Sequence, residues 1–430
     1  MHVLIRSRNG LLCLFTFCLL SLLCVSVSPA AETRPNIVMI LADDVSWNDL
    51  GCYGHPSIRT PNLDRLAKEG LRFDNAYLTI SSCSPSRCSV ITSRYPHNTG
   101  APELHTPLPE GQVLFPQLLR DAGYYTVISG KQHMGPYALT SFDHVSKGKG
   151  PGREEDWVPI LKKRPKDQPF FCWFASTDAH RAWQKSKQTQ PHQPEDVVVP
   201  PYLIDSPETR KDLAQYYDEI SRLDYFTGQI LDELDAQGIA DNTLVLLFAD
   251  NGRPFLRCKT RLYDRGIKTP MMVRWPGVIA PDQVSNEIIS QMDWMPTLLA
   301  AAGDADVKQR LLSGTSANGR SYRVHLDGYN FLPHLTGEAK EGPRKEIFYF
   351  SDDGDLTALR YQDWKLIFME QKTEGTFRVW MEPFVPLRVP LIFNLRRDPY
   401  ERASVTSNTY YDWLLDRAFL LVPAQAYVGQ

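Results

Sequence analysis

The sequence predicts an α/β protein with a large doubly wound sheet flanked by helices and a smaller C-terminal antiparallel sheet plus helix. Over most of the chain, short apolar runs rich in β-branched residues alternate with helical segments, which is typical of a sheet covered by helices on both faces. From about residue 346, paired apolar runs flank a turn instead, which indicates antiparallel strands. Hydrophobic residues make up 43% and charged residues 23% of the 430 residues, as in a globular protein of more than one unit.

The elements of the large sheet can be placed in order along the chain. The first strand is the apolar run 36–41, and the first helix opens at Thr60 with Pro61 in its first turn. The clearest helix runs from about 210 to 234, where apolar side chains recur at helical spacing. Four further apolar runs predict buried strands, at 125–128, 170–174, 244–248 and 271–273.

The composition and the hydrophobic pattern of the chain change after these strands. Residues 301–345 are richer in Gly, Ser and charge, and we expect surface excursions and a domain boundary there. Apolar runs at 347–350 and 364–368 flank the acidic turn 352–355, and a helix near 410–419 is expected to cover them. The predicted domains are therefore a catalytic domain at 32–340 and a small C-terminal α+β subdomain at 341–430.

The first 31 residues have the pattern of a secretory signal peptide. Arg6 and Arg8 precede the apolar run 11–27, and small residues follow, which predicts cleavage near Ala30 or Ala31. A membrane anchor is the alternative, but the apolar run is slightly short for a span. We therefore expect a secreted or periplasmic protein that is not an integral membrane protein after cleavage.

Charge gives no sign of a nucleic-acid partner. The formal net charge is −3, and it becomes −5 without the two arginines of the signal segment. No basic tract appears, so nothing suggests nucleic-acid binding. A mildly acidic enzyme can still bind anions through a local cluster of cations.

Five cysteines follow the signal segment, and Cys83 is the most informative of them. It lies in the string Ser81–Arg87, where Cys-x-Pro-x-Arg is the pattern read by the enzyme that oxidises a cysteine to formylglycine. Such a string also occurs by chance, and a cysteine can equally pack as a small buried side chain. The spacing shows no disulfide framework and no zinc pair, although two disulfides are possible among the other four. Those four are Cys52, Cys88, Cys172 and Cys258.

Acidic pairs stand at the ends of two predicted core strands. Asp43 and Asp44 end the first strand, and Asp250 and Asn251 end the strand at 244–248. In such sheets, sites form at the carboxyl ends of strands. An all-oxygen ligand set suits calcium or magnesium. Cationic side chains near the same strand ends would stabilise a sulfate ester. Each of them alone is more simply interpreted as a solvated side chain. They are Arg87, Lys131, His133, His180 and Lys259.

Together these segments resemble the type I, formylglycine-dependent sulfatases of the alkaline phosphatase superfamily, in the family's order and over almost the whole mature chain. The matching segments are 41–44, 83–87, 130–133, the segment around His180, 250–252, and Lys259 before Tyr263. The resemblance implies an alkaline phosphatase-like mixed sheet, one calcium ion, 3-oxoalanine (formylglycine) made from Cys83, and a formylglycine-generating enzyme as the maturation partner.

The resemblance also implies roles for individual residues. Asp43, Asp44, Asp250, Asn251 and the modified Cys83 would hold the calcium ion. One oxygen of the hydrated aldehyde would attack sulfur, helped by Asp250, and His133 would take a proton from the second hydroxyl as sulfate leaves. The remaining cations would act around them: Arg87 and Lys131 would orient the diol, and His180 and Lys259 would bind sulfate, with His180 protonating the leaving oxygen.

The chain departs from the family pattern at three places. Thr92-Ser93 stands where Thr-Gly usually follows Arg87, which bears on the efficiency of conversion. Thr177–His180 keeps only the second histidine of the usual His-x-Pro-His segment. Similar proteins are expected to continue beyond Gln430.

Two resemblances bear on the substrate. The segments 81–87, 130–136 and 178–181 resemble the heparan N-sulfatase (sulfamidase) branch, whereas 393–401 resembles bacterial arylsulfatases. The sequence therefore predicts a hydrolase of sulfate esters or sulfamates in sulfated carbohydrates, of glycosaminoglycan or algal type. Glu103 and His105, on a loop after the nucleophile helix, are candidates for sugar contacts and equally for solvent-facing loop residues.

Three other functions stay open at this point. The first is a broad-specificity arylsulfatase. The second is a phosphate or phosphonate monoester hydrolase of the same superfamily, although Cys83 with a single metal set argues against two-metal phosphatase chemistry. The third is a non-catalytic protein that binds sulfated glycans and never gains its aldehyde.

Overall fold

A computed structural model describes residues 34–317, 320–372 and 381–429 of the chain. The predicted signal peptide lies outside these residues. Within the described ranges, none of the helices combines the length and the apolar character needed to cross a membrane.

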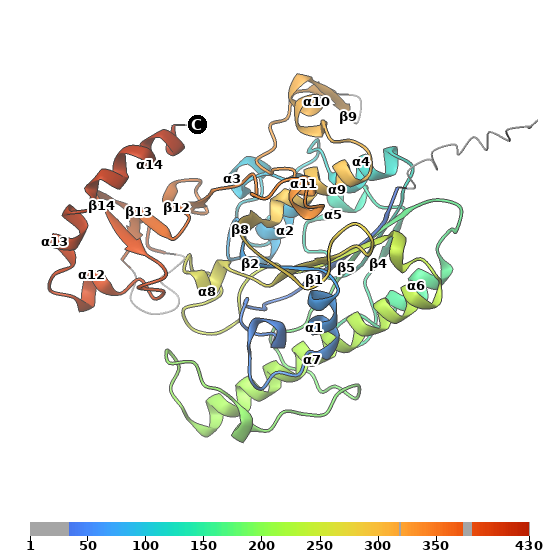
Figure 1. Cartoon of the computed structure of the whole chain (residues 1–430), viewed down its shortest axis with the longest axis horizontal. Helices are drawn as coiled ribbons and strands as arrows, with labels where there is room; N and C mark the ends of the chain where they lie inside the picture. Colours follow the sequence, from blue (N-terminus) through green and yellow to red (C-terminus); the bar gives the residue numbers. More distant parts are fainter. Residues whose placement is uncertain (1–33, 318–319, 373–380, 430) are drawn as a thin grey trace, which may run out of the picture. The chain divides into compact units, whose positions relative to one another are not determined.

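The predicted α/β fold is confirmed, with an eight-stranded mixed sheet at its centre (Figure 1). The strand order is β4-β3-β5-β1-β6-β7-β2-β8. Most neighbouring strands are parallel, and β7 runs antiparallel to both of its neighbours. The strands are β1 (Asn36–Ala42), β2 (Leu71–Tyr77), β3 (Tyr125–Gly130), β4 (His144–Ser146), β5 (Phe170–Ala175), β6 (Thr243–Ala249), β7 (Met271–Arg274) and β8 (Gln283–Ser290).

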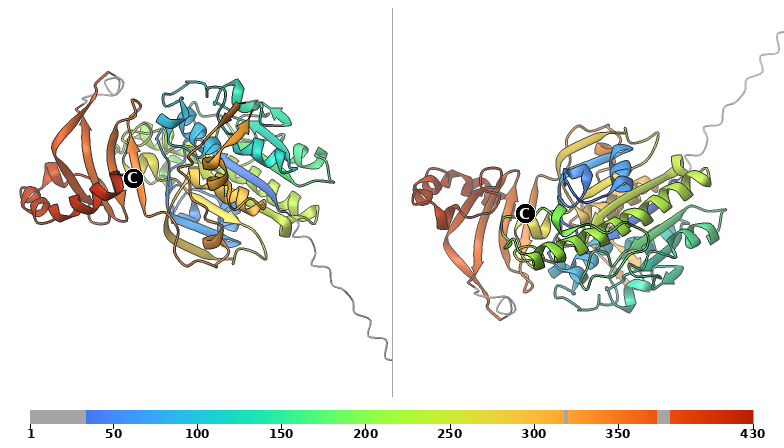
Figure 2. Two further views of the ribbon diagram at one scale, coloured as in Figure 1. Left: turned by 90° about the horizontal axis from the view of Figure 1, so that it is seen from above. Right: turned by 90° about the horizontal axis from the view of Figure 1, so that it is seen from below.

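Helices cover both faces of this sheet, and β1 shows how the sequence achieves it. Alternate side chains of a strand point to opposite faces, so Val38 and Ile40 join one apolar core while Ile37 and Met39 join the other. The first core packs against α1 (Pro61–Lys68), α6 (Trp157–Lys163) and the long α7 (Pro207–Ala236). The second packs against α2 (Cys83–Thr92), α4 (Phe115–Asp121) and α9 (Trp294–Ala301). Figure 1 shows the sheet between the two helix layers, and the two views of Figure 2 look onto these layers from opposite sides.

The C-terminal part is a four-stranded antiparallel sheet in the order β11-β12-β13-β14, as expected in kind. Its strands are β11 (Glu346–Phe350), β12 (Leu356–Tyr361), β13 (Trp364–Gln371) and β14 (Phe384–Asn394). The helices α13 (Tyr410–Leu415) and α14 (Leu421–Val428) pack Tyr410 and Ala424 against its apolar side chains. The predicted boundary near residue 340 stays a prediction.

Three details differ from the sequence-based expectations. The acidic turn leads into β12, which the sequence reading missed, and the run at 364–368 belongs to the next strand. The segment 301–345 is more than surface excursions, because Val307, Leu326 and Phe331 are buried in the main core. Thr60 precedes α1 as expected, but its hydroxyl accepts from the backbone of Gly51 at 2.8 Å instead of capping the helix.

Candidate active site

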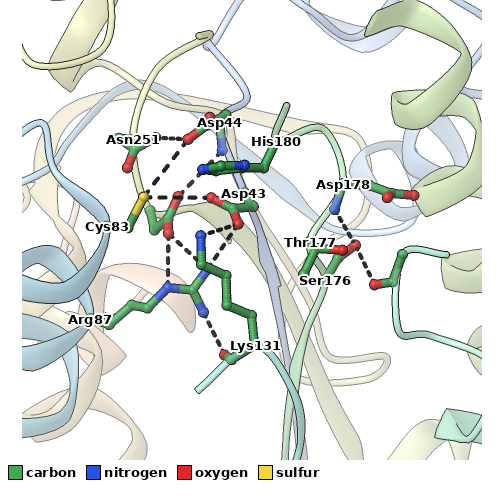
Figure 3. A network of polar contacts seen from close by, with 12 residues as sticks. Asp43, Asp44, Cys83, Arg87, Lys131, Ser176, Thr177, Asp178, His180 and Asn251 are labelled. Atoms are coloured by element: carbon green, nitrogen blue, oxygen red, sulfur yellow. Dashed lines mark hydrogen bonds and ion pairs between the residues drawn. The ribbon is translucent and has the colours of Figure 1, made fainter. Parts of the chain in front are cut away.

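The two acidic pairs predicted at strand ends lie side by side. β1 and β6 are parallel neighbours in register from Asn36–Thr243 to Ala42–Ala249, so the residues after them emerge at the same edge of the sheet. Asp43, Asp44, Cys83 and Asp250 each present a ligand atom, and these four atoms lie within 4.8 Å of one another. All four residues are buried. Figure 3 shows Asp43, Asp44 and Cys83 facing one another.

This cluster has the properties of a cation site. Burial raises the pKa of Asp44 to about 7, and the neighbouring Asp43 and Asp250 add to the rise while Lys259 opposes it. The amide of Asn251 donates to Asp44, and its buried Oδ1 has no hydrogen-bond partner among the described residues. A buried carbonyl-type oxygen without a donor beside three carboxylates fits a hard cation such as calcium.

Three cations surround the carboxylates. The guanidinium of Arg87 lies 2.8 Å (Nε) from Asp250 Oδ2, and its Nη1 donates to the Lys131 carbonyl at 2.8 Å. The Lys131 ammonium pairs with Asp43, and Lys259 Nζ donates to both oxygens of Asp44 at 2.7 and 2.9 Å. Burial alone would raise the pKa of Asp43, but Lys131, Arg87 and Lys259 together hold it well below its usual range. The site therefore combines fixed anions with fixed cations at one strand edge.

Cys83 begins α2 and points into this cluster. Its Sγ lies 3.8 Å from Asp43 Oδ1 and 4.0 Å from Asp44 Oδ1. A helix N-terminus commonly lowers a thiol pKa, but here burial raises the pKa of Cys83, and the charges of Asp250, Asp43 and Asp44 raise it further. The free thiol is therefore neutral in this position, which argues against an ordinary thiolate nucleophile.

The two predicted catalytic histidines lie at this edge of the sheet. The ring of His180 points toward the carboxylates of Asp43 and Asp44 (Figure 3). Burial lowers the pKa of His180, with Lys259 and Lys131 adding to the effect and Asp43 opposing it. Burial, with the charges of Lys131 and Arg87, also lowers the pKa of His133 to about 4.

The predicted sugar-contact residues lie on the loop beside the nucleophile helix. His105 Nδ1 is 2.7 Å from His133 Nε2, and the backbone N–H of His105 donates to Ser84 Oγ at 2.7 Å. Glu103 lines a cavity of about 350 Å³ together with Ser81. The structure thus places His105 against His133, a contact that the sequence did not predict, and sugar binding by either residue stays a prediction.

A buried charged cluster beside His180 was missed by the sequence reading. Arg222 of α7 binds Asp178 through Nε at 2.7 Å and Nη2 at 2.6 Å, and its Nη2 lies 3.2 Å from Glu219. The backbone of Asp178 in turn accepts from the Asp43 N–H at 2.9 Å. These contacts hold the loop that carries His180 against the end of β1. No local motif marks Arg222, because its partner is 44 residues away in the chain.

Cysteine pairing is settled for the described part of the chain. The five cysteines between residues 34 and 429 are all free thiols, so neither of the two possible disulfides forms among them.

Comparison with known proteins identifies the family. The sulfatase family model matches residues 35–304, a model of the C-terminal region of aryl-sulfatase matches 342–420, and one of the C-terminal part of N-sulphoglucosamine sulphohydrolase matches 256–375. The chain belongs to the sulfatase family and is a sulfuric ester hydrolase.

Relatives and solved structures agree with this assignment. Human N-sulphoglucosamine sulphohydrolase is 32% identical over 71% of this chain and 67% of its own length. Human arylsulfatase A is 28% identical over 88% of this chain and 85% of its own. The crystal structure of PsFucS1 sulfatase from Pseudoalteromonas sp. superposes with a TM-score of 0.70 at 21% identity, covering 92% of this chain and 90% of that one. At that identity the structural match shows the fold alone.

Proposed function

We propose that the protein hydrolyses sulfate esters or sulfamates of sulfated carbohydrates, using a formylglycine hydrate derived from Cys83 and one calcium ion. The observation that carries the proposal is the position of Cys83 at the start of α2, with its Sγ among the carboxylates of Asp43, Asp44 and Asp250. A neutral, buried thiol in that position is a poor nucleophile, whereas an oxidised side chain there would stand directly within the cation site.

Five residues would hold the calcium ion. They are Asp43, Asp44, Asp250, Asn251 and the oxidised Cys83, and the unpartnered Asn251 Oδ1 supports the choice of an oxygen-seeking cation. When bound, the ion supplies positive charge that offsets the negative charge of the sulfate oxygens. Arg87, Lys131 and Lys259 add fixed positive charge around the same space.

The modified side chain would supply the nucleophile: a hydrated aldehyde offers one hydroxyl to attack sulfur and a second hydroxyl whose deprotonation expels sulfate. Asp250 lies within the ligand cluster and takes up the proton of the attacking hydroxyl. His133 has a lowered pKa of about 4, so its imidazole is neutral at neutral pH and can accept the proton of the second hydroxyl.

His180 and Lys259 would act as the bond from sulfur to the leaving atom breaks, which is an oxygen in a sulfate ester and a nitrogen in a sulfamate. Burial lowers the pKa of His180, which disfavours its protonated form. A bound sulfate group brings negative charge next to the imidazole, which favours its protonated form. The protonated ring donates its proton to the leaving oxygen or nitrogen, and Lys259 neutralises the charge on sulfate.

The names of the relatives support a sulfated amino sugar as the substrate. N-sulphoglucosamine sulphohydrolase and N-acetylgalactosamine-6-sulfatase, the latter 29% identical to this chain over 86% of it, act by name on a sulfamate and on a sulfate ester. Both linkages are therefore candidate targets of this protein. Because human arylsulfatase A is 28% identical to this chain, a broad-specificity arylsulfatase is the second candidate function.

Maturation and location complete the proposal. A formylglycine-generating enzyme would act on the segment around Cys83, and the predicted signal peptide would direct the chain to the periplasm or outside the cell.

Sulfate release from a matched panel tests the proposal. The protein is co-expressed with a formylglycine-generating enzyme and assayed on N-sulfated and O-sulfated mono- and disaccharides, on an aryl sulfate, and on phosphate and phosphonate monoesters. We expect release from at least one sulfated saccharide, in calcium, with a loss of several orders of magnitude in Cys83→Ala. Turnover of phosphate or phosphonate esters with none of any sulfate ester would overturn it.

A further inference from the structure

A wide cleft opens beside the site, at the side of Lys259. Its volume is about 940 Å³, within the range of small-ligand sites. The loop after β6 forms one wall, and the first turns of α7 form the other. Five basic side chains line the cleft against two acidic ones, although the chain as a whole is acidic. The basic residues are Arg181, Lys211, Arg257, Lys259 and Arg261.

Two of these cations already have partners. Lys259 binds Asp44 in the ligand cluster. Arg181 is held by Asp212, with Nη1 2.9 Å from Oδ1, and its guanidinium lies 4.7 Å from the ring centre of Trp183. Their charges are therefore largely satisfied within the protein.

The other three are not neutralised. Across the part of the chain that the structure describes, no carboxylate lies within 4.0 Å of the charged groups of Lys211, Arg257 or Arg261. The guanidinium of Arg257 lies 5.7 Å from the ring centre of Tyr263. Three cations that share one concave surface repel one another, and an anion bound between them removes that repulsion.

The cleft is continuous with the proposed catalytic site. Lys259 belongs to both, and Arg181 directly follows His180. Lys259 is proposed to bind sulfate, and His180 is proposed to protonate the leaving group, so the rest of the substrate extends from this side. Phe255 and the 60% exposed Leu256 add apolar surface to the wall, which suits the carbon face of a sugar ring.

We propose that Lys211, Arg257 and Arg261 form a second anion-binding subsite, which takes a sulfate or carboxylate group carried by the same glycan on the leaving-group side. The proposal rests on the proposed function, and it makes the preferred substrate a polyanionic oligosaccharide. A neutral aryl sulfate or a monosulfated monosaccharide would fill the catalytic site and leave this subsite empty.

Binding to protein that lacks the nucleophile tests the subsite without catalysis. The probe is a fully sulfated heparin-derived tetrasaccharide, titrated calorimetrically into Cys83→Ala protein with and without Arg257→Gln and Arg261→Gln. We expect Kd to rise about tenfold in the double variant and the salt dependence of binding to become weaker. An unchanged Kd in the double variant would overturn the subsite.

The chain offers a matched control at the far end of α7. Lys68 and Lys163 are both exposed and lie near the end of α7 that holds Asp232 and Glu233, as the pairs Arg65–Asp232 and Lys162–Glu233 show. Lys211 is 22 residues before Glu233 in the helix, which corresponds to roughly 33 Å along its axis. The double variant Lys68→Gln with Lys163→Gln removes the same charge and should leave Kd within about twofold. A tenfold rise there would mean that binding depends only on net charge, against the proposal.

Turnover separates this inference from the proposed function. In the converted enzyme, we expect the double variant to lower the ratio of kcat/KM for the sulfated tetrasaccharide to kcat/KM for 4-methylumbelliferyl sulfate by about tenfold. An unchanged ratio with active enzyme refutes the subsite and leaves the sulfatase proposal standing. The reverse outcome is a double variant that binds the tetrasaccharide more weakly while the converted wild-type protein releases sulfate from no substrate. That outcome would support the subsite and refute the sulfatase proposal.

Discussion

Arg87 and Asp250 form a fully buried ion pair between the nucleophile helix and the end of β6, with Arg87 Nη2 2.7 Å from Asp250 Oδ2. The same carboxylate belongs to the proposed metal site. Arg87 lies about one turn after Cys83 in α2. The pair therefore ties the helix that carries Cys83 to the strand end that carries Asp250 and Asn251, two of the proposed metal ligands.

Loss of this arginine should destabilise the fold as well as the site. Arg87→Ala leaves the buried Asp250 without its partner, and we expect the free energy of unfolding in urea to fall by about 3 kcal/mol. Arg65→Ala is the control, because Arg65 pairs with Glu69, Asp232 and Asp235 at a partly exposed surface; it should cost less than about 1 kcal/mol. Equal losses in the two variants would contradict this reading of the buried pair.

Metal removal should act through the carboxylate cluster. We expect a chelator to lower Tm and abolish sulfate release, and calcium to restore both, because a ligand that binds the folded state stabilises it. Asp44→Asn should need about 100-fold more calcium for the same Tm rise. Asp232→Asn, at an exposed position on α7, should behave like wild type. If the chelator changed neither Tm nor activity, the proposed metal site would be ruled out.

Arg222 should affect catalysis through the loop of His180. Arg222→Gln weakens the hold on Asp178, so we expect lower stability, by about 3 kcal/mol, and a lower kcat with a smaller change in KM. Arg222→Lys keeps the charge and should recover part of kcat. Arg210→Gln on the same helix serves as the control, because it breaks an exposed pair with Asp205, which lies just before the helix. If Arg222→Gln changed KM alone, positioning of His180 would not be its role.

His133 should lower the stability of the folded protein as the pH falls. Its pKa in the fold is lowered from 6.5 to about 4 by burial, Lys131, Arg87 and His105. Between these values the unfolded chain binds a proton that the folded chain does not, so this residue's contribution makes stability fall as pH falls from 6.5 to 4. We expect Tm to drop less in His133→Gln than in wild type between about pH 7 and about pH 4.5. An equal or larger drop in the variant would show that His133 titrates normally.

The sequence predicted the buried strands well and the half-exposed ones poorly. β1, β5 and β6 are apolar on both faces because helices cover both, so each reads as a continuous run. β2 and β8 lie toward one edge of the sheet and carry Arg72, Asp74 and Glu287, which break that pattern. Their pairing with each other depends on contacts more than 200 residues apart in the chain.

The same distinction applies to the site. Asp43 and Asp250 could be expected to meet, because each follows a core strand of a parallel sheet. The contact between His105 and His133 could not, because it depends on two loop residues with left-handed backbone conformations, at φ 71° and 56°. Arg222 was hidden because a helical pattern of apolar residues does not show which polar side chain turns inward.

The chemical state of Cys83 decides whether the protein uses a formylglycine nucleophile. The measurement is mass spectrometry of the tryptic peptide 73–87, taken from protein that has been co-expressed with a formylglycine-generating enzyme and shown to release sulfate. We expect this peptide to carry the mass of the aldehyde in place of the thiol, and activity to rise with the converted fraction. Full sulfatase activity from protein in which Cys83 is found only as the unmodified thiol would contradict this expectation.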